Sequence, residues 1–112
     1  MHREPLARFI LFGGNNMSKN QMIITEGILN RIPAQIQNLI WYLTMLVKSD
    51  VKLHEFSFVA KNINDETIQH LTHRIEDLNY VKEYSFKSNS HINETVYISN
   101  DFTSTMLLAE EY

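Results

Sequence analysis

The stretch PAQIQNLIWYLTMLVK, residues 33–48, decides most of the predicted fold. Proline suits the first position of a helix, because its missing N–H would have no partner there. At about 100° per residue, the apolar side chains fall on two sides of this helix. One side carries Ile36, Leu39, Ile40, Leu43, Leu46 and Val47, and the opposite side carries Ala34, Trp41 and Met45. A helix on a single sheet needs one apolar stripe, so the side with Trp41 and Met45 needs a second cover.

Three covers are open for Trp41 and Met45: another part of the same chain, a second copy of the protein, or a different partner. The burial of apolar residues in small domains favours cover by the same chain. Trp and Met are also enriched in protein interfaces, which keeps an interface open. The sequence therefore predicts a long helix and leaves the cover of its second side undecided.

Strand-like runs surround this helix in the sequence. Alternating or β-branched runs predict strands at residues 22–25, 53–60, 83–86 and 95–99. Apolar residues at 106–109 follow Ser and Thr, a composition that prefers helix, so a short helix or strand is expected to close the chain. The expected fold is α+β: a mostly antiparallel sheet of four to five strands, one long helix packed across a face, and a short C-terminal element.

Residues 67–78 fit two periods. A helix with Asp65 as its cap would place Ile68, Leu71, Ile75 and Leu78 on one side. A strand would instead place Leu71, His73 and Ile75 on one face. The period alone slightly favours the helix.

The chain of 112 residues has room for a single domain. Residues 1–16 stand apart, because two adjacent glycine codons can form a bacterial ribosome-binding sequence and two asparagine codons can form a spacer before Met17. We therefore expect residues 1–16 to be a translated leader or a disordered extension, and residues 17–112 to be the α+β domain. The alternative is that residues 9–12 add a genuine strand or helix to the core.

The charge of the chain argues against a nucleic-acid partner. The net charge is −3, and residues 88–112 hold Glu94, Asp101, Glu110 and Glu111 without any lysine or arginine. Nucleic-acid affinity needs clustered Lys and Arg, which this sequence lacks. No apolar run approaches the roughly 20 residues of a membrane span, and we expect a cytoplasmic protein without membrane contact.

Few residues in the chain point to catalysis. There is no cysteine, which excludes thiolate metal sites and cysteine nucleophiles. His70 and His73 form a His-x-x-His pattern, but no further ligand stands at a convincing spacing, so we expect no metal. No nucleophile elbow, phosphate loop or dinucleotide fingerprint is present, and no cofactor is expected. The sequence leans against an enzyme without deciding the question.

The leading functional hypothesis is a small non-enzymatic interaction or regulatory module that binds a protein partner or a second copy of itself. Its expected contact surface comprises Trp41, Met45, Met106, Leu107, Glu110, Glu111 and Tyr112. The C-terminal end would either dock in a partner groove or pack on its own sheet, and the second is favoured because a small domain needs its apolar residues for the core. The alternative hypothesis is a small enzyme or small-molecule binder with a pocket lined by tyrosines and His70 or His73.

The C-terminal sequence STMLLAEEY, residues 104–112, resembles the terminal signature of an uncharacterised Gram-positive bacterial family catalogued as domain of unknown function 960. TEGI at residues 25–28, ahead of Ile32-Pro33, agrees in order with that family. The resemblance implies a bacterial source, a native start after residue 16, and a strand in place of a helix over 67–76. It implies no activity, since none is established for the family.

Overall fold

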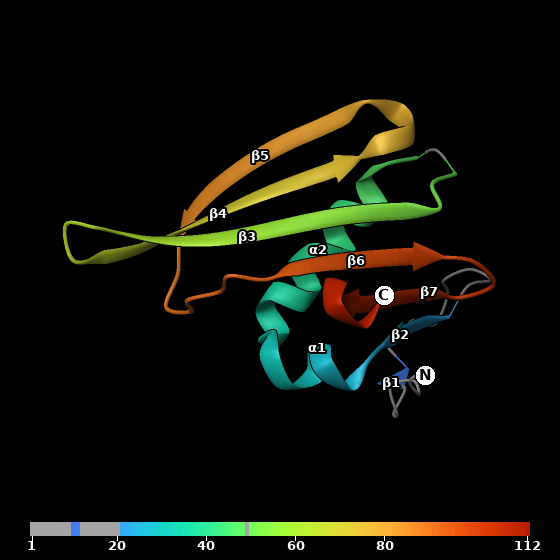
Figure 1. Cartoon of the computed structure of the whole chain (residues 1–112), viewed down its shortest axis with the longest axis horizontal. Coiled ribbons are helices and arrows are strands. Elements are labelled where there is room, and N and C mark those ends of the chain that lie inside the picture. Colours follow the sequence, from blue (N-terminus) through green and yellow to red (C-terminus); the bar gives the residue numbers. More distant parts are fainter. Residues whose placement is uncertain (1–9, 12–20, 49) are drawn as a thin grey trace.

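The computed structural model describes residues 10–11, 21–48 and 50–112, which build a mixed β-sheet with a long helix across one face (Figure 1). The strands are β1 (Ile10–Leu11), β2 (Met22–Ile24), β3 (Leu53–Ile63), β4 (Glu66–Ile75), β5 (Tyr80–Lys87), β6 (Thr95–Asn100) and β7 (Ser104–Leu108). The helices are α1 (Glu26–Arg31) and α2 (Ala34–Leu46), with short 3-10 turns η1 (Glu76–Leu78) and η2 (Ala109–Glu111).

The α+β class is confirmed, and the sheet is larger than predicted. Its order is β1-β2-β7-β6-β3-β4-β5, so six strands and the two-residue β1 replace the expected four to five. The sheet is also mixed, because β2 runs parallel to β7 while the other neighbours are antiparallel. This parallel pair could form because α1, α2 and further strands separate β2 from β7 along the chain, which leaves room for a crossover.

Helix α2 buries one broad face instead of two opposite stripes. Its buried side chains are Ile36, Gln37, Ile40, Trp41 and Leu43. The polar side chains between the two expected stripes can belong to the same face because backbone carbonyls satisfy them. Gln37 Nε2 donates to Ile32 O at 2.7 Å, and Thr44 Oγ1 donates to Ile40 O at 2.8 Å. The chain itself covers Trp41, which is 4% exposed, so the favoured one of the three open covers, the same chain, holds for the indole. Leu46, expected in the core stripe, is instead exposed.

Residues 66–75 form strand β4, so the helical alternative for 67–78 was wrong. Asn64 and Asp65 both have positive φ, 54° and 66°, which is the backbone of a two-residue hairpin turn between β3 and β4. Asp65 is therefore a turn residue and not a helix cap. Within this segment only residues 76–78 are helical, as the 3-10 turn η1.

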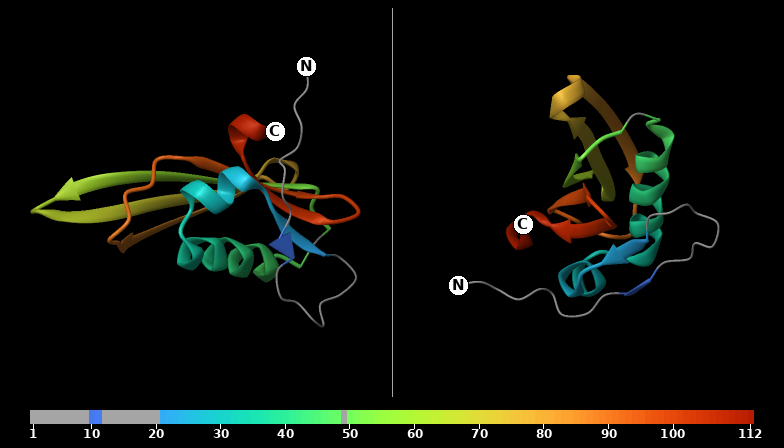
Figure 2. Two further views of the ribbon diagram at one scale, coloured as in Figure 1. Left: turned by 90° about the horizontal axis from the view of Figure 1, so that it is seen from below. Right: turned by 90° about the vertical axis from the view of Figure 1, so that its right-hand side faces the viewer.

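The C-terminal run is strand β7 followed by η2, so the strand, one of the two alternatives left open for this element, forms although the composition prefers a helix. Strand β7 lies between β2 and β6, and Met106 and Leu108 reach the core with 0% and 1% exposure. Figure 2 shows α2 on one side of the sheet and the C-terminal turn on the other. Within the described part of the chain, no helix is long and apolar enough to cross a membrane.

At the other end, Ile10 and Leu11 pair with Ile24 and Ile23 to extend the sheet by a short strand. The rest of residues 1–16, on which the leader prediction depends, lies outside the described residues.

Candidate functional site

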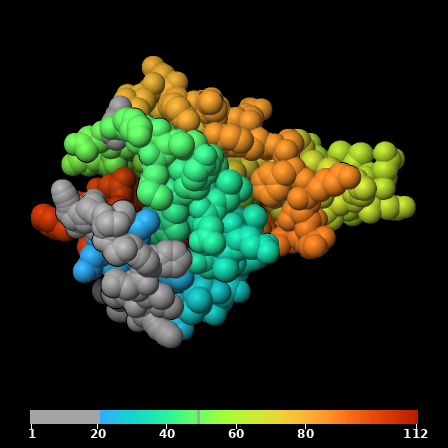
Figure 3. Space-filling model, turned by 180° about the vertical axis from the view of Figure 1, so that it is seen from behind, coloured from blue at the N-terminus to red at the C-terminus, as the bar shows by residue number. Residues whose placement is uncertain are grey.

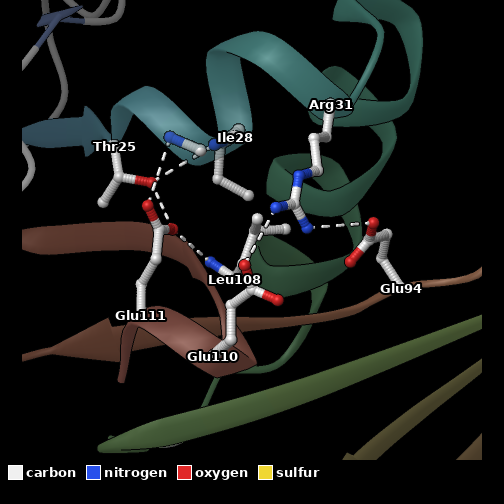
Figure 4. Close-up of polar contacts among 8 residues, drawn as sticks. Thr25, Ile28, Arg31, Glu94, Leu108, Glu110 and Glu111 are labelled. Atoms are coloured by element: carbon white, nitrogen blue, oxygen red, sulfur yellow. Dashed lines mark hydrogen bonds and ion pairs between the residues drawn. The ribbon is translucent and has the colours of Figure 1, made fainter.

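The carboxylate of Glu111 joins the end of the chain to the start of α1 (Figure 4). Its Oε1 accepts from Thr25 Oγ1 and from Leu108 N, both at 2.8 Å, and its Oε2 accepts from Gly27 N at 3.2 Å. Thr25 is the N-cap of α1 and also accepts from Ile28 N at 3.3 Å. The first N–H groups of a helix lack internal partners, and a negative charge is favourable there. Glu111 therefore stabilises the junction of two segments distant in sequence.

Gly27 makes room for this carboxylate. A Cβ placed at residue 27 would lie 2.6 Å from Glu111 Cδ, which is too close for a real contact. Glycine is otherwise a poor helix residue, since it costs about 1 kcal/mol relative to alanine. Its presence inside α1 is thus explained by the approach of Glu111.

We predict that Gly27→Ala displaces the Glu111 carboxylate and lowers the free energy of unfolding by about 1 kcal/mol, because the lost hydrogen bonds outweigh the gain in helix propensity. Urea unfolding measures the change. The same substitution in a Glu111→Ala background should become neutral or stabilising. If Gly27→Ala lowers the free energy of unfolding equally in both backgrounds, the approach of Glu111 does not explain the glycine.

A second carboxylate from η2 forms an ion pair with the end of α1. Arg31 Nη2 lies 2.9 Å from Glu110 Oε2, and Arg31 Nη1 lies 3.3 Å from Glu94 Oε2. The Arg31 side chain is nearly half exposed, so this pair contributes little stability. Glu110 and Glu111 thus both face the chain's own α1.

The predicted contact residues do not form one surface. Trp41, Met106 and Leu107 are buried at 4%, 0% and 9% exposure, which corrects their assignment to an interaction surface. The physical reason is that β7 is an inner strand and the indole lies in the core. Tyr112 is exposed, although its ring meets Tyr97 edge-on at 5.0 Å. Met45 is half exposed on α2, remote in sequence from the C-terminal end.

Two buried histidines lie side by side on the core face of the sheet. His54 Nδ1 and His73 Nε2 are 2.9 Å apart, and the His73 ring stacks on Phe56 with 4.1 Å between centroids. Burial lowers the pKa of both imidazoles to about 4, so both are neutral at neutral pH and one donates to the other. Among the described residues His73 Nδ1 has no hydrogen-bond partner.

The two histidines proposed as alternative members of a tyrosine-lined pocket lie on opposite faces of the sheet. His73 lies in the core beside Tyr80, whereas His70 projects from the opposite face and bonds Ser85 Oγ at 2.8 Å. Two open hollows, of about 470 Å³ beside η2 and about 390 Å³ at the end of α2, contain neither histidine nor tyrosine in their walls. No group of three potential metal ligands is found in the part of the chain that the structure describes.

The outer face of α2 exposes grouped apolar side chains. Tyr42, Met45 and Leu46, at helical spacing, are 57%, 52% and 53% exposed. None of the residues of α2 is Asp, Glu, Lys, Arg or His. Figure 3 shows this helix across the rear of the molecule, next to β5. The sequence predicted Met45 as a contact residue but not Tyr42 or Leu46. The lack of charged residues over 34–46 could have indicated that this helix face is covered by a partner.

Comparisons of the chain with protein-family models, with curated proteins and with solved structures found no match. The family resemblance of residues 104–112 and 25–28 therefore stays a prediction. In the structure these two segments are the ones that Glu111 joins.

Proposed function

We propose that this chain is a non-enzymatic protein-interaction module whose contact surface is the outer face of α2, formed by Tyr42, Met45 and Leu46. The observation that supports it best is an exposed helix face without charge. A solvated helix face normally carries charged residues, whereas interface centres are depleted of charge and enriched in aromatic residues and methionine. Apolar side chains grouped in this way indicate a surface that another protein covers.

The chemistry of α2 also selects the class of partner. Without lysine or arginine the face offers no contact to phosphate, which disfavours nucleic acid. Without acidic residues it offers nothing to a basic surface. The proposed partner is therefore a folded protein with an uncharged, apolar patch, and the proposed compartment is the cytoplasm.

Site-specific photocrosslinking tests this proposal in cells that make the protein. A photoreactive phenylalanine analogue at Tyr42 is expected to give an adduct of one defined mass, and Leu46→Glu in the same chain should reduce its yield about tenfold, because a buried unpaired charge opposes binding. The matched control carries the analogue at Phe102, which is 92% exposed on the β6–β7 connection, and should give no such adduct. Equal adducts from both positions, or an adduct insensitive to Leu46→Glu, would refute the proposal.

A further inference from the structure

Strand β5 ends the sheet with one side of its backbone open. It is the last strand in the sheet order, and no described segment pairs with its outer edge. Ser88 N donates to Thr67 O at 3.1 Å, which shows that the N–H groups of even-numbered residues point towards β4. Because backbone groups alternate along a strand, those of Val81, Glu83, Ser85 and Lys87 point outward. Such an edge is a template for another strand.

We propose that β5 pairs with β5 of a second copy of this chain, antiparallel, about a two-fold axis at Ser85. This surface differs from the outer face of α2, so the inference stands or falls separately from the proposed function. A two-fold axis perpendicular to the sheet keeps each face on its own side. The two sheets become one, and both α2 helices lie on the same face of it.

Charge complementarity selects the register. With Ser85 opposite Ser85 of the second copy, Glu83 lies opposite Lys87 of the second copy, and the symmetry repeats that pair. Centring the axis on Lys82 or on Glu83 would instead place like charges opposite each other, which is destabilising. Centring it on Tyr84 leaves the charges unpaired. The Ser85 register is the one in which Glu83 and Lys87 each gain an opposite partner.

The same register matches the side chains on the core face. It places Tyr84 opposite Phe86 of the second copy, an aromatic cross-strand pair of the kind that stabilises sheets. Both rings are half-buried in the single chain, so pairing would remove more of their surface from water. On the other face Lys87 Nζ lies 3.4 Å from Glu66 Oε1, and the second copy adds another carboxylate to it. Hydrogen bonds, charges and apolar contacts thus agree on one alignment.

A charge swap tests the register by sedimentation velocity over a concentration series. Glu83→Lys and Lys87→Glu should each weaken dimerisation about tenfold, because two attractive pairs become repulsive. The double variant carries both substitutions, so each pair is again one base opposite one acid, and it should restore the affinity of the natural chain. A monomeric natural chain at every concentration, or a double variant no tighter than the singles, overturns the inference.

The backbone is tested by Ser85→Pro, with Ser85→Ala as the matched control. Proline removes only an N–H that points away from β4, so the fold should persist while the dimer is lost. In the natural chain, hydrogen exchange at the amides of Glu83, Ser85 and Lys87 should slow as concentration rises, while that of Tyr84 should not change. A dimer that survives the proline, or lacks this alternating protection, overturns the inference even if α2 crosslinks as proposed.

Discussion

Glu111→Ala is expected to lower the free energy of unfolding by about 2–3 kcal/mol, the larger of two effects predicted for the carboxylates of η2. The substitution leaves the hydroxyl of Thr25 and the amides of Gly27 and Leu108 without their acceptor. Each hydrogen bond to a charged group contributes about 1.5–3 kcal/mol, and water can replace part of that at a half-exposed position. The start of α1 and the end of β7 should loosen together.

Glu110→Ala is the matched control, since it removes a neighbouring carboxylate from the same turn. Its ion pair with Arg31 is exposed, and the expected loss is below about 0.5 kcal/mol. Urea unfolding of both variants, with amide exchange of Ile28 as the local measurement, distinguishes them. Equal losses for the two substitutions would mean that Glu111 does not hold the junction. Retained protection at Ile28 in Glu111→Ala would lead to the same conclusion.

Local patterns in the sequence predicted most of the regular elements. Strands expected at 53–60, 83–86 and 95–99 lie within β3, β5 and β6, and the helix expected over 33–48 is α2 with its ends slightly shortened. These segments contain enough alternating or helical apolar positions to show their period directly. Pro33 marks the N-cap, one residue before the first turn.

Strand β4 was ambiguous because its core face contains polar residues. Gln69 and His73 alternate with Leu71 and Ile75 on that face, and both are fully buried. The backbone of Ile92 satisfies the Gln69 side chain. Gln69 Nε2 donates to Ile92 O at 2.7 Å, and Ile92 N donates to Gln69 Oε1 at 3.1 Å. From the sequence alone a glutamine is expected to face solvent, because the partner that satisfies it when buried is remote in sequence. Tertiary contacts therefore decided what the period could not.

The contact surface was mispredicted for a related reason. Met106, Leu107 and Leu108 form an unbroken apolar run, which suits an inner strand covered on both faces as well as it suits a helix. The strands on either side of β7 are residues 22–24 and 95–100, and no local sequence pattern predicts that β7 lies between them. The Glu111 junction was missed likewise, because neither helix α1 nor the distant carboxylate that holds its N-cap was predicted.

Acid is expected to destabilise the fold through the His54–His73 pair, by up to about 4 kcal/mol between neutral pH and pH 5. In the unfolded chain each imidazole binds a proton below about pH 6.5, whereas in the fold burial lowers the pKa of each to about 4. The unfolded state therefore binds more protons between these values, and stability falls as pH drops through that window. The slope is about 1.4 kcal/mol per pH unit for each histidine.

Urea unfolding at neutral pH and at about pH 5 measures this loss. His73→Phe keeps a ring stacked on Phe56 and removes one titrating group, so the loss on acidification should fall by about half. His70→Gln is the matched control, because His70 lies on the opposite face and is not buried, and its variant should lose as much as the natural chain. Contributions from all other groups are common to the three proteins and cancel in the comparison. If His73→Phe loses as much stability as the natural chain, the acid sensitivity does not arise from the buried pair, and the neutral imidazoles would be a packing feature alone.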